Sequence, residues 1–252
     1  MLVAAAVCPH PPLIVPELAG AAAPELDGLR AACAAAIGAV LAVDHDLLVV
    51  VGSDERTRAY GGQAAGTLGP WGVDVRVGEG EPVLPLSLTI GRWLLAMQPT
   101  GEPTSEPTGG TAGGRVGTAA AGRRLMFQGV ASDASVAECL ALGAELVEGR
   151  RTALLVMGDG SACLTEKSPG YLHPAAGPYN EEIVRALAEA DTGALAAMDP
   201  AEAAALWVAG RAALQVLAGA AEGAALRPAL LDESSPYGVG YFVATWLEGR
   251  AP

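Results

Sequence analysis

Hydrophobic residues along the chain fall into two alternating patterns. Short runs rich in Val, Leu and Ile are apolar at nearly every position, which is typical of strands in a sheet that is covered on both faces. Ala-rich stretches with helical spacing lie between them. The predicted strands are Leu2–Val7, Asp46–Gly52, Leu125–Ala131, Thr152–Met157, Leu226–Leu231 and Val239–Trp246, and the predicted helices are Pro24–Val43, Pro85–Ala96, Ala134–Glu148, Asn180–Ala190 and Pro200–Ala218. This alternation predicts an α/β fold with a central, mostly parallel sheet and helices on both faces.

Local signals mark the starts of two of these helices. Ser135 and Glu138 have the spacing of a capping box, in which each side chain bonds to the backbone N–H of the other residue. Asp199 stands as an N-cap before Pro200, with Glu202 at the third helical position. We therefore expect helices to begin at these two points.

The stretch at about 98–122 has no hydrophobic period. It consists largely of Pro, Gly, Thr and Ser, which predicts a flexible surface loop. The alternation of strands and helices resumes after it in the same style, and no repeat is detectable. The sequence therefore predicts a single α/β domain over residues 1–252 with a long insertion.

Composition and charge narrow the range of partners. The chain has 28 acidic against 15 basic side chains and a formal net charge of -13, which argues against binding to nucleic acid phosphates. No apolar run is long enough for a membrane span, and the first residues lack the basic start of a secretory signal. The four cysteines form no CxxC pair, which suits reduced thiols. We expect a cytoplasmic protein that binds neither nucleic acid nor membranes.

Polar and reactive residues follow four of the predicted strands. Ligands of open α/β sheets bind outside the carboxyl ends of the strands, so these segments form the candidate site. They are residues 8–12 (CPHPP), 52–56 (GSDER), 158–163 (GDGSAC) and 232–238 (DESSPYG). Each segment combines polar side chains with a glycine or proline. The turn at the end of a strand requires the same residue types, so this combination has a purely structural explanation as well.

Three of these segments resemble motifs of the class III extradiol ring-cleavage dioxygenases, the LigB-like superfamily. Residues 8–12 are similar to the family's PHPP-type segment, residues 158–161 to its GD-x-S-H segment, and residues 236–241 (PYGVGY) to its E-x-P-F-G-V-G-Y segment. The motifs stand in the family's order and span nearly the whole chain. The resemblance implies the LigB-like α/β fold. Active members hold non-haem Fe(II) with two histidines and one glutamate, and a further histidine acts as acid and base.

Only part of the family's metal site has matching residues in this sequence. His10 matches the first metal-binding histidine. The second position, after the Asp46–Gly52 strand, offers Asp54 or Glu55, and the sequence leaves that choice open. One imidazole among several carboxylates is a harder ligand set, which favours Mg, Ca or Mn over Fe(II). We therefore expect metal binding to be weak or absent.

The remaining family positions are also changed. Ala162 stands where the family has its acid/base histidine, and an alanine side chain cannot transfer a proton. Ser234 occupies the position of the glutamate ligand, two residues before Pro236, and Glu233 lies beside it. Adjacent residues on a strand point to opposite faces, so Glu233 is not an automatic substitute.

The two other histidines of the chain are His45 and His173. His45 precedes its strand and is expected at the surface, at the opposite end of the sheet from the site. His173 follows the third segment and offers two alternatives: a loop residue facing water, or a replacement ligand or base folded over the pocket. A rebuilt metal site would then combine His10 and His173 with one of Asp54, Glu55 or Asp159.

The sequence and the resemblance together predict two alternative functions. In the first, the chain is a LigB-like protein with largely replaced iron and acid/base residues, which cleaves no rings and keeps a pocket for a small aromatic or carboxylated molecule. In the second, an active metal-dependent extradiol dioxygenase or related oxidoreductase uses His10 and His173, with His173 as the catalytic group. In both, the pocket lies at the carboxyl ends of the strands. It is bounded by His10, Asp54, Glu55, Asp159, Ser161, Ala162, Cys163, Ser234 and Tyr237.

One apolar helical stretch is expected to be buried, either inside the chain or against a second copy. The stretch Ala203–Ala218 has few charges, which predicts either a homodimer surface or a thick buried helix layer. The four tryptophans, Trp71, Trp93, Trp207 and Trp246, are expected in the core or at an interface. Arg56 and Arg58 either bind a carboxylate ligand or belong to a solvated loop.

Overall fold

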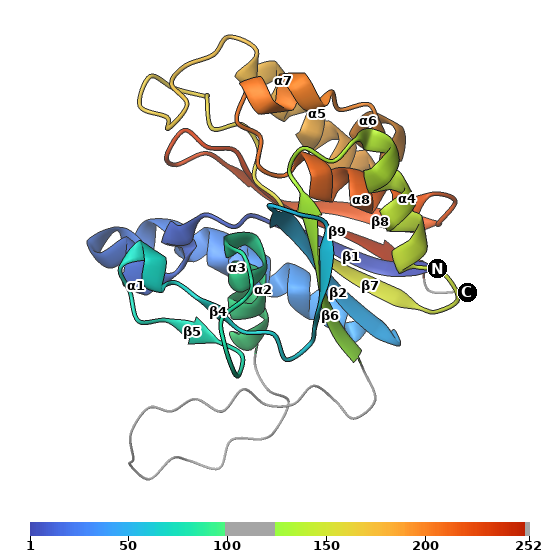
Figure 1. The fold of residues 1–252 in the computed structure, drawn as a ribbon. Helices are drawn as coiled ribbons and strands as arrows, with labels where there is room; N and C mark the ends of the chain where they lie inside the picture. The colour runs from blue at the N-terminus through green and yellow to red at the C-terminus, as the bar shows by residue number, and fades with distance from the viewer. Residues whose placement is uncertain (99–123, 250–252) are drawn as a thin grey trace.

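The structure, a computed structural model, describes residues 1–98 and 124–249, and it confirms the predicted α/β fold. The loop predicted at about 98–122 lies outside the described residues except for Gln98. A seven-stranded sheet with the order β3-β6-β2-β7-β1-β9-β8 runs through the centre (Figure 1). Its strands are β1 (Leu2–Cys8), β2 (Leu47–Asp54), β3 (Arg58–Gly61), β6 (Arg124–Ala131), β7 (Thr152–Met157), β8 (Leu226–Ser234) and β9 (Tyr241–Glu248). A separate two-stranded sheet pairs β4 (Gly66–Thr67) with β5 (Arg76–Val77).

The four strands in the middle of the sheet are parallel neighbours, in the order β6, β2, β7 and β1. β3 is antiparallel to β6 at one edge, and β9 is antiparallel to both β1 and β8 at the other. β8 therefore runs in the same direction as β1. As a result, the carboxyl ends of β1, β2, β6, β7 and β8 lie along one edge of the sheet.

Helices cover both faces of the sheet (Figure 1). On one face lie α2 (Asp27–Ala42) and α3 (Leu86–Ala96), and on the other lie α4 (Val136–Leu146), α5 (Ala176–Glu189), α6 (Thr192–Ala196) and α8 (Arg211–Ala221). Side chains of β2 alternate between the two faces, since Val49 and Val51 join the α4–α8 core while Leu48 and Val50 join the α2–α3 core. This double coverage is why the strands are continuously apolar in sequence. The short remaining elements are α1 (Pro16–Ala19), α7 (Pro200–Ala205) and three 3-10 turns at Pro12–Ile14, Gly20–Leu26 and Gly69–Trp71.

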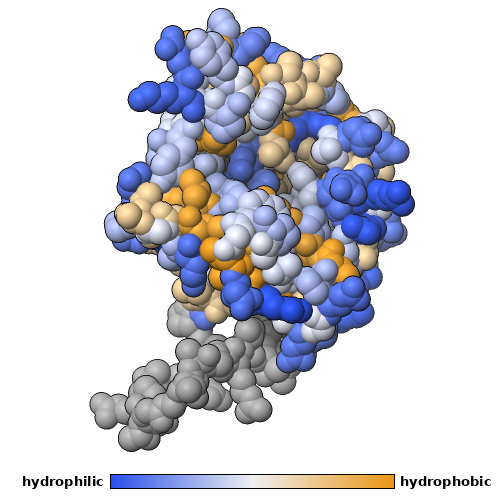
Figure 2. Space-filling model, turned by 60° about the vertical axis from the view of Figure 1, so that its left-hand side comes forward, coloured by the Kyte–Doolittle hydropathy of each residue, from blue (hydrophilic) through white to orange (hydrophobic). Residues whose placement is uncertain are grey.

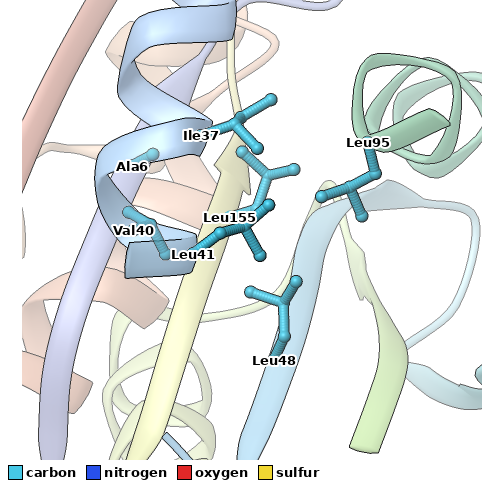
Figure 3. A pocket seen from close by; sticks show the side chains of 7 residues that line it. All are labelled: Ala6, Ile37, Val40, Leu41, Leu48, Leu95 and Leu155. Atoms are coloured by element: carbon cyan, nitrogen blue, oxygen red, sulfur yellow. The ribbon is translucent and has the colours of Figure 1, made fainter. Parts of the chain in front are cut away.

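The α2–α3 side of the sheet is densely packed. Seven apolar side chains converge between α2, α3 and the strands below them (Figure 3). Among them, Ile37 and Leu41 of α2 approach Leu95 of α3 over Leu48 and Leu155 of the sheet. The gap between these side chains has no room for a water molecule, so it is core packing and no ligand site.

The closest helix crossing is between α4 and α8. A Cβ atom added at Gly143 would lie 2.1 Å from the carbonyl oxygen of Val216, and one added at Gly219 would lie 2.1 Å from that of Leu140. The two helices therefore meet backbone against backbone, a contact that any side chain would prevent.

Both predicted helix starts are confirmed. The Ser135 hydroxyl accepts from the Glu138 N–H, and the Glu138 carboxylate accepts from the Ser135 N–H, which completes the capping box. Asp199 caps α7 by accepting from the Glu202 N–H at 2.8 Å. The helix predicted from Asn180 begins earlier, at Ala176.

The prediction of one continuous helix over Pro200–Ala218 is wrong. The helix stops at Ala205, the backbone turns through Trp207 with a φ of +53°, and α8 begins at Arg211. Every residue of α8 is buried within the chain. The α8 part of the apolar stretch thus forms a thick inner layer, the second of the two predicted alternatives, while Ala204, Ala205 and Trp207 of the preceding part are exposed. The homodimer stays a prediction.

In the described part of the chain, no helix has the length and apolar character needed to cross a membrane.

Candidate functional site

The carboxyl edge of the sheet brings the predicted segments together. β1, β2, β7 and β8 all end there, so residues 8–12, 52–56, 158–163 and 232–238 lie along the same side of the molecule. Figure 2 turns the left side of Figure 1 toward the viewer and shows a hollow with hydrophilic residues on its floor and apolar residues beside it. The edge has the location that a ligand site has in open α/β sheets.

His10 and Asp159 face each other at the ends of β1 and β7. The backbone N–H of His10 donates to Asp159 Oδ1 at 2.8 Å, and the same oxygen lies 3.6 Å from His10 Nδ1. Both residues are buried, with 6% and 8% of their surface exposed. A separation of 3.6 Å is too long for a direct hydrogen bond, and Nδ1 has no hydrogen-bond partner among the described residues. His10 Nδ1 is therefore a buried nitrogen that makes no hydrogen bond with the described residues.

The electrostatics of Asp159 agree with this incomplete bonding. Burial raises the pKa of the Asp159 carboxyl, and the weaker opposing effects of the His10 side chain and backbone N–H do not cancel that rise. A carboxyl in this position binds a proton more readily than an exposed aspartate does.

The segment after β7 is held in place mainly through its backbone. The Gly160 N–H donates to the Gly240 carbonyl, and the Ser161 N–H donates to Asn180 Oδ1 at 2.9 Å. The Ser161 hydroxyl donates to the Leu206 carbonyl at 2.7 Å. Ser161 is fully buried, so it supports the wall of the site.

The two residues after Ser161 are also buried. Ala162 is 9% exposed, and its N–H donates to the Leu206 carbonyl. The Cys163 thiol is 1% exposed and lies 3.5 Å from the Gly170 carbonyl. These residues border the strand edge from inside the protein, and neither presents a free acid/base group.

Asn180 is a site residue that the sequence did not single out. Besides bonding Ser161, it packs where Gly160 and Gly240 leave no room for a side chain: a Cβ at Gly240 would lie 2.2 Å from Asn180 Nδ2. Asn180 thus joins the third segment to Gly240, just before β9. In the sequence, a single polar residue in an amphipathic helix is only a weak signal of a site residue. The same asparagine is equally well explained as the residue that begins the helix.

Asp54 lies at the end of β2 but bonds to its own neighbours. Its carboxylate accepts from Arg58 Nε at 3.0 Å, from the Tyr60 hydroxyl at 2.6 Å and from the Glu55 N–H at 2.7 Å. Burial alone would raise the pKa of Asp54, but these hydrogen bonds outweigh burial and lower it. Burial and the Asp54 carboxylate raise the pKa of Tyr60 to about 12. Arg58 is therefore the partner of Asp54, while Glu55 and Arg56 are exposed.

The fourth segment closes the edge without supplying a metal ligand. The Ser234 hydroxyl donates to Asp232 Oδ2 at 2.8 Å, and Glu233 is exposed. The Tyr237 hydroxyl donates to Glu25 Oε2 at 3.1 Å, which ties the β8–β9 turn to the 3-10 turn before α2.

His173 lies in the loop after the third segment and is exposed. Its Nδ1 accepts from the Ala175 N–H at 3.2 Å, and its own N–H donates to the Cys163 carbonyl. These bonds make His173 part of the local turn, which matches the alternative of a loop residue facing water.

The surface position predicted for His45 is wrong. His45 is 4% exposed, and its Nδ1 lies 2.7 Å from the Val43 carbonyl. The connection between α2 and β2 is pulled inward because the Asp46 N–H donates to the Arg151 carbonyl and the Asp46 carbonyl accepts from Arg124. The residues next to His45 in the sequence do not reveal these long-range contacts of Asp46.

The residues do not fit a facial iron site. Across residues 1–98 and 124–249, no group of three or more His, Cys, Asp or Glu side chains could hold a metal ion. His10, Asp54 and Glu55 are not brought together as ligands, since Asp54 is bonded to Arg58 and Tyr60 and Glu55 is exposed. A site built on two imidazoles and one carboxylate needs donors that this edge lacks.

Large exposed aromatic residues flank the edge. Trp207 is 58% exposed and Tyr171 is 61% exposed, and both have a positive φ. Trp207 lies between Leu206, which bonds Ser161, and Gly210, whose N–H donates to the Asp159 carbonyl. Trp207 is therefore no core residue, which leaves the interface alternative as a prediction, and its unusual backbone is fixed by contacts with the site.

Comparison with known proteins adds little to this site. No family model matches the chain, and no curated protein matches it. Among solved structures, the chain is similar to the uncharacterized protein JW3007 from Escherichia coli K12, with 15% sequence identity over 97% of this chain and 99% of that chain and a TM-score of 0.49. A likeness at that level identifies neither a family nor a function.

Proposed function

We propose that this chain is a LigB-like protein that has lost ring-cleaving chemistry and binds a small molecule at the carboxyl edge of its sheet. The observation that carries the proposal is the buried His10–Asp159 pair, in which His10 Nδ1 has no hydrogen-bond partner among the described residues and lies 3.6 Å from Asp159 Oδ1. Unsatisfied buried polar atoms are rare in native proteins, and a ligand or water commonly satisfies them.

A hydroxyl or amide group of the ligand would bridge the two side chains. A hydroxyl is both a donor and an acceptor, so it would donate to one of His10 Nδ1 and Asp159 Oδ1 and accept from the other when that atom carries a proton. The raised pKa of Asp159 favours the protonated form that such a bond needs. The pair would thus orient a polar group and exchange a proton with it.

Loss of ring cleavage is the second part of the proposal. Where the family shuttles its proton, this chain has the buried Ala162. General acid/base groups contribute about a hundredfold to ten-thousandfold to rates. With one imidazole at the edge and Asp54 bonded elsewhere, no reaction step through iron follows from these residues.

The ligand we favour is a small aromatic or carboxylated molecule. Trp207 and Tyr171 offer exposed aromatic surface next to the edge, and Arg56 is an exposed cation at the end of β2. The four cysteines are free and buried, which suits a reducing compartment and a cytoplasmic location.

Binding is tested with protocatechuate, a small aromatic acid, by isothermal titration calorimetry. We expect His10→Ala to abolish binding, because it removes Nδ1, one of the two atoms that the ligand would bridge. The matched control is His173→Ala, which removes an exposed histidine and should leave the affinity within about twofold. Equal binding by wild type and the His10 variant would contradict the proposal.

Ring cleavage is tested separately. Protein purified anaerobically and supplied with Fe(II) should show no oxygen uptake with catechol or protocatechuate. Oxygen uptake that both His10→Ala and His173→Ala abolish would replace this proposal with the alternative, an active dioxygenase with a rearranged site.

A further inference from the structure

A cavity lies between three helices away from the strand edge. It has a volume of about 200 Å³ and is lined by α5, α6, α7 and the link between the last two. None of its lining residues comes from the four strand-end segments. We propose that this cavity is a second binding site, which takes a small organic amine with an apolar body and a cationic ammonium group.

The floor of the cavity is apolar. Ile183, Ala186 and Leu195 line it and are at most 2% exposed, and Met198 is 8% exposed. Apolar cavities of about 150 Å³ already hold a benzene molecule, so this volume accepts a ring or a short branched chain. Burial of such a group in place of solvent supplies the affinity.

The rim of the cavity is acidic. Glu182, Asp199 and Glu202 line it, and Asp199 and Glu202 have no ion pair with a basic side chain in the described part of the chain. The neighbouring Arg185 is shared among three carboxylates, those of Glu182, Glu189 and Asp191. Negative charge therefore remains uncompensated at the mouth, and it favours a cation over a neutral or anionic molecule of the same shape.

The nearby Arg211 lowers the pKa of the lining Tyr179 but forms no ion pair with the carboxylates at the mouth in the described part of the chain. The guanidinium of Arg211 is buried and donates to the carbonyls of Ser132 and Ala134 and to Gln215. Its bonds thus face the start of α4. The charge of the chain as a whole, -13, adds to the attraction for cations.

Tyr179 supplies the third element of the site. It lines the cavity, and its hydroxyl is buried without a hydrogen-bond partner among the described residues. Burial and then the carboxylate of Glu202 raise the pKa of Tyr179 to about 12, against an opposing effect of the Arg211 guanidinium, and Asp199 adds a smaller rise. In the proposed complex this oxygen accepts a hydrogen bond from the ammonium group that Glu202 attracts.

The test uses benzylamine as probe and benzyl alcohol as its neutral equivalent, with binding followed by NMR chemical-shift titration. We expect benzylamine to bind in the millimolar range or better, with shifts at Ile183 and Leu195, and benzyl alcohol to bind at least about threefold more weakly. Equal affinity for the two compounds, or the absence of benzylamine binding at millimolar concentration, would overturn the proposal.

Variants separate the charge from the cavity. Glu202→Gln should weaken benzylamine binding about threefold and leave benzyl alcohol unaffected. Glu181→Gln is the matched control, because it removes one carboxylate charge at an exposed position of α5 that does not line the cavity, and it should change neither affinity by more than about twofold. An equal effect of the two substitutions would assign the preference to overall charge and refute the site.

Filling the cavity gives an independent check. Ala194→Met places a larger side chain at a partly buried lining position and should reduce the affinity for both compounds at least tenfold. If this variant binds benzylamine as wild type does, the cavity is not the site. Should it fail to fold, Ala197→Met, at an exposed lining position, provides the same measurement.

Discussion

Two aspartates end neighbouring strands of the same sheet and have opposite surroundings. Asp54, after β2, accepts hydrogen bonds from Arg58, Tyr60 and the Glu55 backbone, and its pKa is lowered. Asp159, after β7, accepts one backbone hydrogen bond, and its pKa is raised by burial. A carboxylate whose bonds are all made inside the protein serves the fold. One whose bonds are incomplete is available to a ligand, which is why we assign the site to Asp159 and His10.

The largest expected effect in this comparison is at Asp54. Asp54→Asn replaces an accepting oxygen by an N–H₂ group that faces the donors of Arg58 and Tyr60. We expect a loss of about 2 kcal/mol in the free energy of unfolding, below the range for fully buried ion pairs because Arg58 is half exposed. Urea denaturation at pH 7 measures it, and an unchanged midpoint would show that the cluster is not structural.

Tyr60→Phe should have the next largest effect. It removes one hydrogen bond to Asp54 while keeping the ring, so we expect a loss of about 1 kcal/mol. The same variant should be less sensitive to alkali than wild type. With its pKa raised to about 12, Tyr60 keeps its proton in the folded state after the unfolded state has lost its own near pH 10, so stability falls between these values. Identical alkaline unfolding curves for the two proteins would contradict this.

Asp159→Asn should change stability less and in the opposite direction. The amide can still accept from the His10 N–H, and it removes a carboxylate that is costly to bury. At pH 7 we expect a small increase in the free energy of unfolding together with loss of protocatechuate binding. A variant that is both less stable and fully able to bind would reverse the roles that we give to the two aspartates.

The smallest signal is a difference between two pH profiles. Because the folded pKa of Asp54 is lowered, its contribution is present above the unfolded value of about 3.9 and is lost as the pH falls through the folded pKa. Because that of Asp159 is raised, its destabilising contribution is absent at low pH and grows as the pH rises through the folded value. The stability difference between wild type and the Asp54 variant should therefore rise from pH 3 to pH 7, and that for the Asp159 variant should fall. Parallel profiles would remove the distinction.

The sequence predicts the features of this molecule that depend on local rules. Apolar runs and Ala-rich stretches define the α/β fold, and the caps at Ser135 and Asp199 define where two helices begin. The rule that strand ends share one edge also brings His10 and Asp159 together, although they are 149 positions apart.

Features that depend on long-range contacts were not predictable in the same way. The break between α7 and α8 exists because the backbone of residues 206–210 bonds to Ser161 and Asp159, whereas helical spacing continues through it in the sequence. The partners of Asp54 follow from β3 folding back beside β6, which brings Tyr60 next to the end of β2. Asn180 and the cavity at Tyr179 arise from how α5 packs, and no motif marks either one.

The backbone contact between α4 and α8 bears on how the molecule opens. At Gly143 and Gly219 the backbones of the two helices meet with no side chain between them, and we expect these helices to separate only together with the rest of the core. Amide protons of α8 should therefore exchange with deuterium only when the whole domain unfolds, at rates set by its global stability. Those of α6 and α7, two short helices beside the cavity, should exchange through smaller local openings. The chain would then contain one cooperative unit, formed by the sheet and α8, and two peripheral helices, α6 and α7, that open far more often.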